Sequence, residues 1–167
     1  MSIHIRRDGR PCFSVDHNEY VSAGIIPYTI KDGRTSFLMQ AVVKRGWDWE
    51  DFGGKSDAVD KSILDVAIRE CLEELNHEVT REFLVSCLHH EKTIVCPIPD
   101  SKYMLYFMYI PLEHMKFFNT ERFGDLEKMH KISRTVHWVD KMSLCALTRK
   151  GVLNPRIQGI LMRCLKK

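Results

Sequence analysis

The segment 62–76 constrains the fold most, because it carries the clearest helical pattern in the chain. Ser62 is suited to cap the amino end of a helix, with Asp65 three residues later in an approximate capping box. Apolar side chains then recur at helical spacing, namely Leu64, Ala67, Ile68, Cys71, Leu72 and Leu75. Asn76 can adopt the left-handed conformation that ends a helix. One face of this helix must therefore be covered by another element.

A β-sheet is predicted to supply that cover. Residues 23–30 and 35–44 are apolar and rich in strand-forming side chains, and the Asp32-Gly33 pair between them is typical of a hairpin turn. The two segments should pair antiparallel. A further short strand is expected around residues 50–52, leading into a glycine loop.

The remainder of the chain predicts more strands and a final helix. Strands are expected at residues 83–89, 102–110 and 135–139, with 93–96 as another candidate before a proline-rich breaker at 97–100. Residues 112–130 should form a long loop with one or two helical turns. Asn154 followed by Pro155 predicts the start of a helix with Ile157 and Ile160 on its apolar stripe. This order predicts an α/β fold, a mixed sheet with helices on both faces, in one domain over residues 1–167.

Composition narrows the class of protein. With 167 residues, 44% apolar and 28% charged, the chain suits one soluble domain, and a net charge of +3 permits an anionic ligand without requiring nucleic acid. The six cysteines form no CxxC pair, so neither a zinc site nor a disulfide framework is predicted. Arg6 and Arg7 precede no secretion signal, and no apolar run reaches the length of a membrane span. A cytoplasmic location is expected, with a nuclear one as the alternative, and no membrane partner.

Three glutamates lie on the helix face opposite the apolar stripe. Glu70, Glu73 and Glu74 stand at i, i+3 and i+4, and carboxylates this close repel one another unless a cation lies between them. Mg²⁺ takes oxygen ligands and is completed by substrate phosphates, so a Mg²⁺ site is predicted, with Mn²⁺ as the alternative. Gly53 and Gly54 should let the backbone approach an ion or phosphate, because glycine tolerates unusual dihedrals. The chemistry indicated is metal-assisted hydrolysis at phosphorus.

Four neighbouring side chains complete the predicted site. Lys55 should meet a phosphate as a point charge, and Arg69 should pair with a glutamate and fix its rotamer. Arg45 could face an anionic substrate, and Trp47 could stack on a base. For Trp47 and its neighbour Trp49, packing of one of them into the core of a short strand is the alternative.

With these residues in view, segment 53–76 resembles the Nudix box. That pattern is Gly, five residues, Glu, seven residues, Arg-Glu, an aliphatic residue, any residue, Glu-Glu, any residue, Gly and an aliphatic residue. The matching positions are Gly54, Arg69, Glu70, Glu73 and Glu74. The flanking layout is also similar to the α/β/α sandwich of that family. The resemblance implies a pyrophosphohydrolase in which these three glutamates and the Gly53 carbonyl hold the metal, Glu70 and Glu74 as the principal ligands.

The segment departs from the box in its loop and at its end. Fourteen residues, 55–68, separate Gly54 from Arg69 where the pattern has thirteen, so the first glutamate position falls on Asp60 or Lys61, with Asp57 as another candidate carboxylate. Asn76 and His77 replace the terminal glycine and aliphatic residue.

Several functions share this box. The leading hypothesis is hydrolysis of a nucleoside diphosphate linked to another group; the alternatives are mRNA decapping, inositol pyrophosphate hydrolysis and a non-catalytic nucleotide-binding module. A small-molecule nucleotide is the expected partner, and a basic C-terminal face leaves RNA open: Arg156, Arg163, Lys166 and Lys167. A general base outside the box would come from a later loop, although each of these acids is expected to be solvated at the surface: Glu91, Glu121, Asp125 and Glu127.

Overall fold

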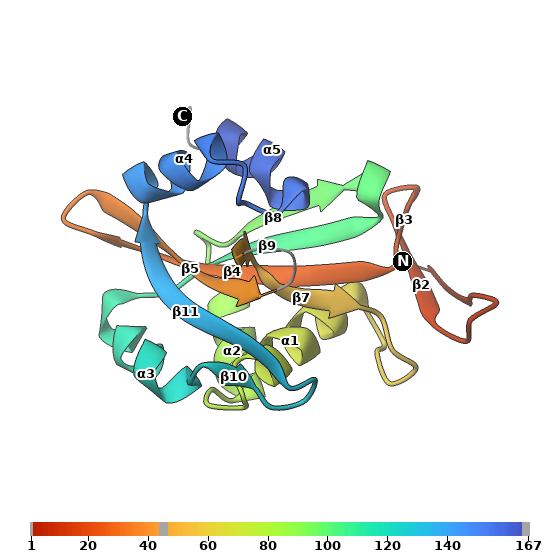
Figure 1. Cartoon of the computed structure of the whole chain (residues 1–167). Coiled ribbons are helices and arrows are strands. Elements are labelled where there is room, and N and C mark those ends of the chain that lie inside the picture. The colour runs from red at the N-terminus through yellow and green to blue at the C-terminus, as the bar shows by residue number, and fades with distance from the viewer. Residues whose placement is uncertain (1, 44–46, 165–167) are drawn as a thin grey trace.

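A mixed β-sheet between two layers of helices forms the body of the molecule (Figure 1). The computed structural model describes residues 2–43 and 47–164. The strands of the sheet are β4 (Ser22–Lys31), β5 (Arg34–Val43), β6 (Trp47–Glu50), β7 (Phe52–Lys55), β8 (Ile94–Ile98), β9 (Tyr103–Tyr109), β10 (Leu126–Glu127) and β11 (Ile132–Asp140). Their order is β10-β11-β5-β4-β9-β8, with β6 paired to β5 and β7 paired to β4.

Helices cover both faces of this sheet. One face carries α1 (Ile63–Glu74) and α2 (Arg81–Leu88), and the other carries α4 (Lys141–Arg149) and α5 (Pro155–Cys164) (Figure 1). Two 3-10 turns, η1 (Pro99–Ser101) and η2 (Leu112–Phe117), and the short α3 (Thr120–Phe123) complete the connections. The predicted α/β/α sandwich is therefore confirmed.

Strand β9 shows how the sheet joins the two layers. All seven of its residues are buried, and successive side chains point to opposite faces. Tyr103, Leu105 and Phe107 enter the apolar cluster beneath α4 and α5, whereas Met104 and Tyr106 enter the cluster beneath α1 and α2. The strand runs parallel to β4, in a register that joins Ser22 to Tyr103 and Tyr28 to Tyr109. Burial on both faces explains its unbroken apolar sequence.

The predicted hairpin is confirmed with a two-residue turn. Strands β4 and β5 pair antiparallel up to Lys31 and Arg34. Asp32 and Gly33 between them have φ of 50° and 72°. Positive φ at both positions is the backbone that an Asp-Gly turn favours in a hairpin.

The strand predicted at residues 83–89 is wrong, because this segment is helix α2. Thr80 caps it, since its Oγ1 accepts a hydrogen bond from the Phe83 amide at 3.2 Å. Leu84, Cys87 and Leu88 form the buried face, at the i, i+3 and i+4 spacing of a helix. Phe83, Val85 and Cys87 alternate as apolar side chains do in a strand. The Thr80 cap and the packing of Leu84, Cys87 and Leu88 favour the helix instead.

Two other predictions need adjustment. The breaker predicted at residues 97–100 starts later, because β8 continues through Pro97 to Ile98. Strand β8 is at the sheet edge, where a proline without an amide hydrogen is tolerated. Residues 52–55 form strand β7 rather than a glycine loop, since Gly53 and Gly54 pair with Gly24 and Ala23 of β4.

Helix α4 and a small N-terminal sheet had no counterpart in the sequence prediction. This sheet has the order β1-β2-β3, with β1 (Ser2–Ile5), β2 (Pro11–Val15) and β3 (Asn18–Tyr20). It flanks the end of β7 (Figure 1), and the Ser56 hydroxyl donates to the Pro11 carbonyl at 2.7 Å.

Among the described residues, no helix is both long and apolar enough to cross a membrane.

Candidate active site

Helix α1 begins and ends at the predicted residues. The Ser62 hydroxyl oxygen accepts from the Asp65 amide at 3.0 Å, and the hydroxyl donates to the Asp65 carboxylate at 2.9 Å. At the other end Asn76 has a φ of 56°, and the His77 amide donates to the Leu72 carbonyl at 2.8 Å. These bonds close the helix as a left-handed cap.

The Asn76 side chain explains why this position is not glycine. Its Nδ2 donates to the carbonyls of Phe123 at 2.8 Å and Leu126 at 2.9 Å, and its Oδ1 accepts from the Lys128 amide at 2.9 Å. Asn76 therefore caps the helix and also fixes the loop that leads into β11. A glycine would supply only the first of these functions.

Arg69 organises the acidic face of α1. Its Nε and Nη2 donate to the two oxygens of Asp60, both at 3.0 Å, and its Nη2 also donates to the Lys55 carbonyl at 2.8 Å. Its Nη1 donates to Glu70 at 2.9 Å and to Glu73 at 3.2 Å. Burial alone would lower the pKa of Arg69, but the bond to Asp60 and the nearby carboxylates outweigh it and raise the pKa. Arg69 thus pairs with two glutamates rather than one.

Asp60, not Lys61, faces the box helix. Its side chain is 2% exposed and accepts the bidentate fork of Arg69. One carboxylate oxygen also accepts from the Asp57 amide at 2.6 Å, which tightens the loop ahead of the helix. Asp60 therefore holds Arg69.

Glu70 lies directly over the backbone of Gly54. A methyl group on Gly54 would stand 2.6 Å from Glu70 Oε1, closer than atoms can approach. Burial raises the pKa of Glu70, while the charge of Arg69 opposes that shift. Neither Gly53 nor Gly54 has a positive φ, so these glycines provide space rather than an unusual backbone conformation.

Glu74 is turned toward the interior. Its Oε2 is buried and has no hydrogen-bond partner among the described residues. Burial raises the pKa of Glu74 well above its usual range, Gln40 opposes the shift with a hydrogen bond, and the like charges of Asp51, Glu50 and Glu70 add to it. A buried carboxylate oxygen without a partner, beside two more carboxylates of the same helix, suits a hard divalent cation.

A pocket of about 270 Å³ opens beside these glutamates. It is lined by Arg10, Lys55, Ser56, Asp57, Arg69, Glu70, Glu73, Met129 and His130. Glu70 and Glu73 form its acidic side, and the side chains of Arg10, Lys55 and His130 supply basic groups. The pocket therefore combines carboxylates for a metal with cationic donors for an anion.

Comparisons with known proteins bear on the fold. No family model matches the sequence. An uncharacterised protein of Acanthamoeba polyphaga mimivirus is 46% identical over 57 residues, which cover 32% of this chain and less than a fifth, 18%, of the viral protein. An Ap4A hydrolase of C. elegans aligns at 19% identity and a TM-score of 0.47, over 84% of this chain and 91% of that one. A Listeria monocytogenes structure described as a Nudix hydrolase aligns at a TM-score of 0.52 and 12% identity, over 87% and 92% of the two chains.

The chain has the Nudix fold. The resemblance carried by the box is thus confirmed at the level of the fold.

Sequence reasoning missed two basic residues of the pocket beside α1, Arg10 and His130. Arg10 comes from the turn between β1 and β2, and His130 from the turn between β10 and β11. Each residue is more than 40 positions from the nearer end of the box. No spacing pattern in the sequence could therefore connect Arg10 or His130 to the box. Only the tertiary arrangement brings them to the pocket.

Glu127 positions His130, and its expected surface location is wrong. Its carboxylate is buried, accepts from the amides of Met129 at 2.7 Å and His130 at 2.9 Å, and lies 3.2 Å from His130 Nδ1. The other three loop acids are exposed, as expected: Glu91, Glu121 and Asp125. Glu127 is therefore occupied in holding the turn that brings His130 to the pocket.

The two tryptophans and Arg45 give a mixed outcome. Trp49 packs with the cluster beneath α4 and α5, its ring centroid 5.8 Å from that of His137. Packing was the alternative stated for one of the tryptophans. Arg45 and the side chain of Trp47 lie outside the part of the chain that the structure describes, so their substrate contacts stay predictions.

Arg156 does not contribute to a basic outer face. Its guanidinium lies over the Tyr103 ring, 4.6 Å from the centroid, and its Nη2 is 3.9 Å from the buried Asp51 carboxylate. The expectation for Arg156 is thus wrong, because the side chain turns inward to a buried charge. Arg163, as a side chain, and Lys166 and Lys167 lie outside the described residues.

The two box glycines should respond differently to alanine. At Gly54 the added methyl meets the end of the flexible Glu70 side chain, so the protein should stay folded while Glu70 is displaced. At Gly53 the methyl meets backbone, with Gly24 Cα at 2.5 Å and the Ala23 carbonyl oxygen at 2.6 Å. Gly53→Ala should therefore cost about 1–3 kcal/mol or more of stability by overpacking. Urea denaturation of both variants checks this, and equal losses would contradict it.

Proposed function

We propose that this chain is a divalent-metal-dependent hydrolase that cleaves the phosphoanhydride bond of a nucleoside diphosphate derivative. The supporting observation is the pocket beside α1, where Glu70 and Glu73 lie near the basic side chains of Arg10 and Lys55. Glu74 Oε2, on the same helix but outside the lining of that pocket, is buried without a hydrogen-bond partner among the described residues. The acids of a solvated helix face would be exposed, whereas the side chains of Glu70 and Glu73 are only 12% and 10% exposed.

The residues divide into three roles. Glu70, Glu73 and Glu74, with the Gly53 carbonyl, would hold Mg²⁺ or Mn²⁺. When bound, that ion would supply an activated water and neutralise charge on the phosphate oxygens. The basic residues of the pocket, Arg10, Lys55 and His130, would bind phosphate oxygens and orient the diphosphate group.

Arg69 and Asp60 act as positioning residues in this proposal. The guanidinium of Arg69 is fixed by Asp60 and by the Lys55 carbonyl, which leaves Nη1 to align Glu70 and Glu73. We assign the general base to a box glutamate. Glu127, the one buried acid among the later-loop candidates, is already bonded to turn amides.

The size of the pocket bears on the substrate. About 270 Å³ is just below the range of typical small-molecule sites, so it suits a diphosphate group rather than an entire dinucleotide. The groups attached to the diphosphate would extend beyond the pocket, and their identity would be selected by other parts of the surface.

A substrate screen tests the proposal. Purified protein with Mg²⁺ should release a monophosphate product from at least one of nucleoside triphosphates, ADP-ribose, dinucleoside polyphosphates, capped RNA and inositol pyrophosphates. A chelator should abolish the release, and Mg²⁺ or Mn²⁺ should restore it. Product release unaffected by the chelator would contradict the metal-dependent mechanism.

The same screen separates the alternatives. Turnover restricted to capped RNA, with salt-sensitive RNA binding, would favour decapping, and turnover restricted to inositol pyrophosphates would favour that substrate class. Thermal stabilisation by a nucleotide without turnover of any compound would favour a non-catalytic binding module.

A further inference from the structure

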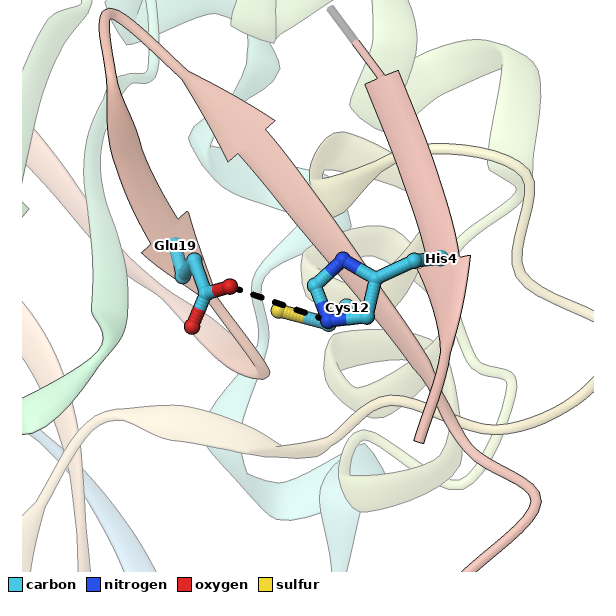
Figure 2. A group of neighbouring side chains, drawn as sticks. All are labelled: His4, Cys12 and Glu19. Atoms are coloured by element: carbon cyan, nitrogen blue, oxygen red, sulfur yellow. Dashed lines mark ion pairs between the residues drawn. The ribbon is translucent and has the colours of Figure 1, made fainter. Parts of the chain in front are cut away.

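A second cluster of ligand-type side chains lies on the N-terminal sheet, outside the Nudix box. Figure 2 shows His4 from β1, Cys12 from β2 and Glu19 from β3 converging. One nitrogen, sulfur or oxygen atom from each lies within 4.8 Å of the others, and His4 Nε2 is 3.7 Å from Glu19 Oε1.

Strand pairing places these side chains on one face. His4 is directly opposite Cys12, and Glu19 is opposite Ser14, two residues along β2 from Cys12. Because side chains alternate along a strand, Cys12 and Ser14 share a face, and their partners share it too. The cluster is therefore fixed by the backbone of the sheet.

Cys12 is buried outside the two apolar clusters of the protein. The residue is only 1% exposed, yet it belongs to neither apolar cluster of the protein. Its neighbour Phe13 and the opposite Tyr20 point the other way, into the core beneath α1. The thiol thus lies on the polar face of the sheet with His4 and Glu19 around it, unlike a cysteine that packs as a small apolar side chain.

A sulfur, an imidazole nitrogen and a carboxylate oxygen are the donors that Zn²⁺ takes in proteins. Zn–N bonds of about 2.0–2.1 Å and Zn–O bonds of about 2.0–2.2 Å in a tetrahedron separate a nitrogen from an oxygen donor by about 3.3–3.5 Å. The 3.7 Å between His4 Nε2 and Glu19 Oε1 is slightly longer, so binding would draw the two side chains together. Their side chains are 52% and 44% exposed, so they can adjust to an ion that enters from solvent. Mg²⁺, which prefers oxygen donors, does not suit the thiol.

The charges around the cluster also suit this ion. Lys102 Nζ bonds the second oxygen of Glu19, Oε2, at 2.7 Å, which leaves Oε1 toward His4. A Cys12 thiolate and the Glu19 carboxylate would together balance the two charges of the ion. Lys102 would act on Glu19 from outside, as a partner that orients a metal-binding carboxylate.

We propose that His4, Cys12 and Glu19 form a Zn²⁺ site with three protein ligands, separate from the site of the Nudix box. Such an ion would join all three strands of the small sheet and so fix the β1–β2 turn that carries Arg10 to the pocket. The absence of a CxxC pair did not exclude it, because each ligand comes from a different strand.

Cobalt titration with excess Mg²⁺ present tests this proposal. Co²⁺ should bind one equivalent and produce the near-ultraviolet absorption of a thiolate–cobalt bond, and Zn²⁺ should remove that absorption. Cys12→Ser should abolish it. His4→Ala should weaken Zn²⁺ binding at least about 100-fold, as measured by calorimetry. Removing a residue that only hydrogen-bonds a metal ligand usually weakens binding by about 10–100-fold, so a larger loss indicates a direct ligand.

Matched variants control the experiment. His17→Asn, in the adjacent turn, and Cys145→Ser, on α4, should leave both readouts unchanged. Because Cys12 is buried, the exposed ligands provide tests that do not disturb packing, and circular dichroism verifies that each variant folds. A thiolate–cobalt absorption that survives in Cys12→Ser, or is absent from the unaltered protein, would overturn the proposal. None of these readouts requires hydrolysis, so failure here is distinct from failure of the proposed function.

Discussion

Glu74→Gln should lower turnover of any substrate by at least about 10²–10³-fold while leaving the protein folded. The substitution keeps the shape of the side chain and removes its charge. Because Glu74 Oε2 is buried and has no hydrogen-bond partner in the part of the chain that the structure describes, its charge is proposed to be used for the metal ion. Initial rates of phosphate release at saturating Mg²⁺ measure the effect.

Stability provides a second readout for the same variant. The pKa of Glu74 is raised in the folded protein by burial first, so the ionised form destabilises the metal-free fold once the pH exceeds the unfolded pKa. In the absence of metal, Glu74→Gln should therefore melt at the same or a higher temperature than the unaltered protein near neutral pH. Mg²⁺ should raise the melting temperature of the unaltered protein more than that of the variant.

Glu82→Gln is the matched control, since Glu82 is exposed on the first turn of α2. It should retain full turnover and the full response to Mg²⁺. Turnover by Glu74→Gln at the unaltered rate would show that the box does not act through this carboxylate.

Arg69→Ala should cost about 3–5 kcal/mol of stability, the usual result of leaving a buried charge without its partner. The loss arises at Asp60, whose side chain is 2% exposed and whose two oxygens are both bonded to Arg69. Adding Asp60→Asn to Arg69→Ala should recover part of the loss, because the unpaired charge is then gone. Urea denaturation of the two single variants and the double variant measures the coupling.

Arg81→Ala is the comparison for Arg69→Ala. Arg81 pairs with Asp65 near the surface, and its side chain is 48% exposed, so its removal should cost no more than about 1 kcal/mol. Equal losses from Arg69→Ala and Arg81→Ala would contradict the assignment of Arg69 as the centre of the network.

The sequence was most informative where a local rule decides the structure. Ser62 and Asn76 set the ends of α1, and Asp32-Gly33 set the hairpin, because caps and two-residue turns depend on a few adjacent residues. The three carboxylates were found for the same reason, since helical spacing alone gathers Glu70, Glu73 and Glu74 on one side.

Prediction failed where distant residues decide the structure. Residues 83–89 have an apolar pattern that suits a strand or a helix, and packing against the sheet selects the helix. The partners of Arg69 could not be ranked until the fold placed Asp60 beside it. Arg10 precedes the box in the sequence and His130 follows it, so only the fold brings both to the pocket. Glu127 could not be identified as buried from its loop position.

The parallel pairing of β4 with β9 sets an order of events during synthesis. Residues 22–28 of β4 cannot pair with β9 until residues 103–109 have been synthesised. Pairing between segments so far apart in the sequence is intrinsically slow. Tyr103 also lies against the point where Gly24 and Gly53 meet. A growing chain that ends before β9 would thus contain the whole box yet lack the contact that fixes its glycines. The box is thus synthesised before the strand whose Tyr103 lies against its glycines.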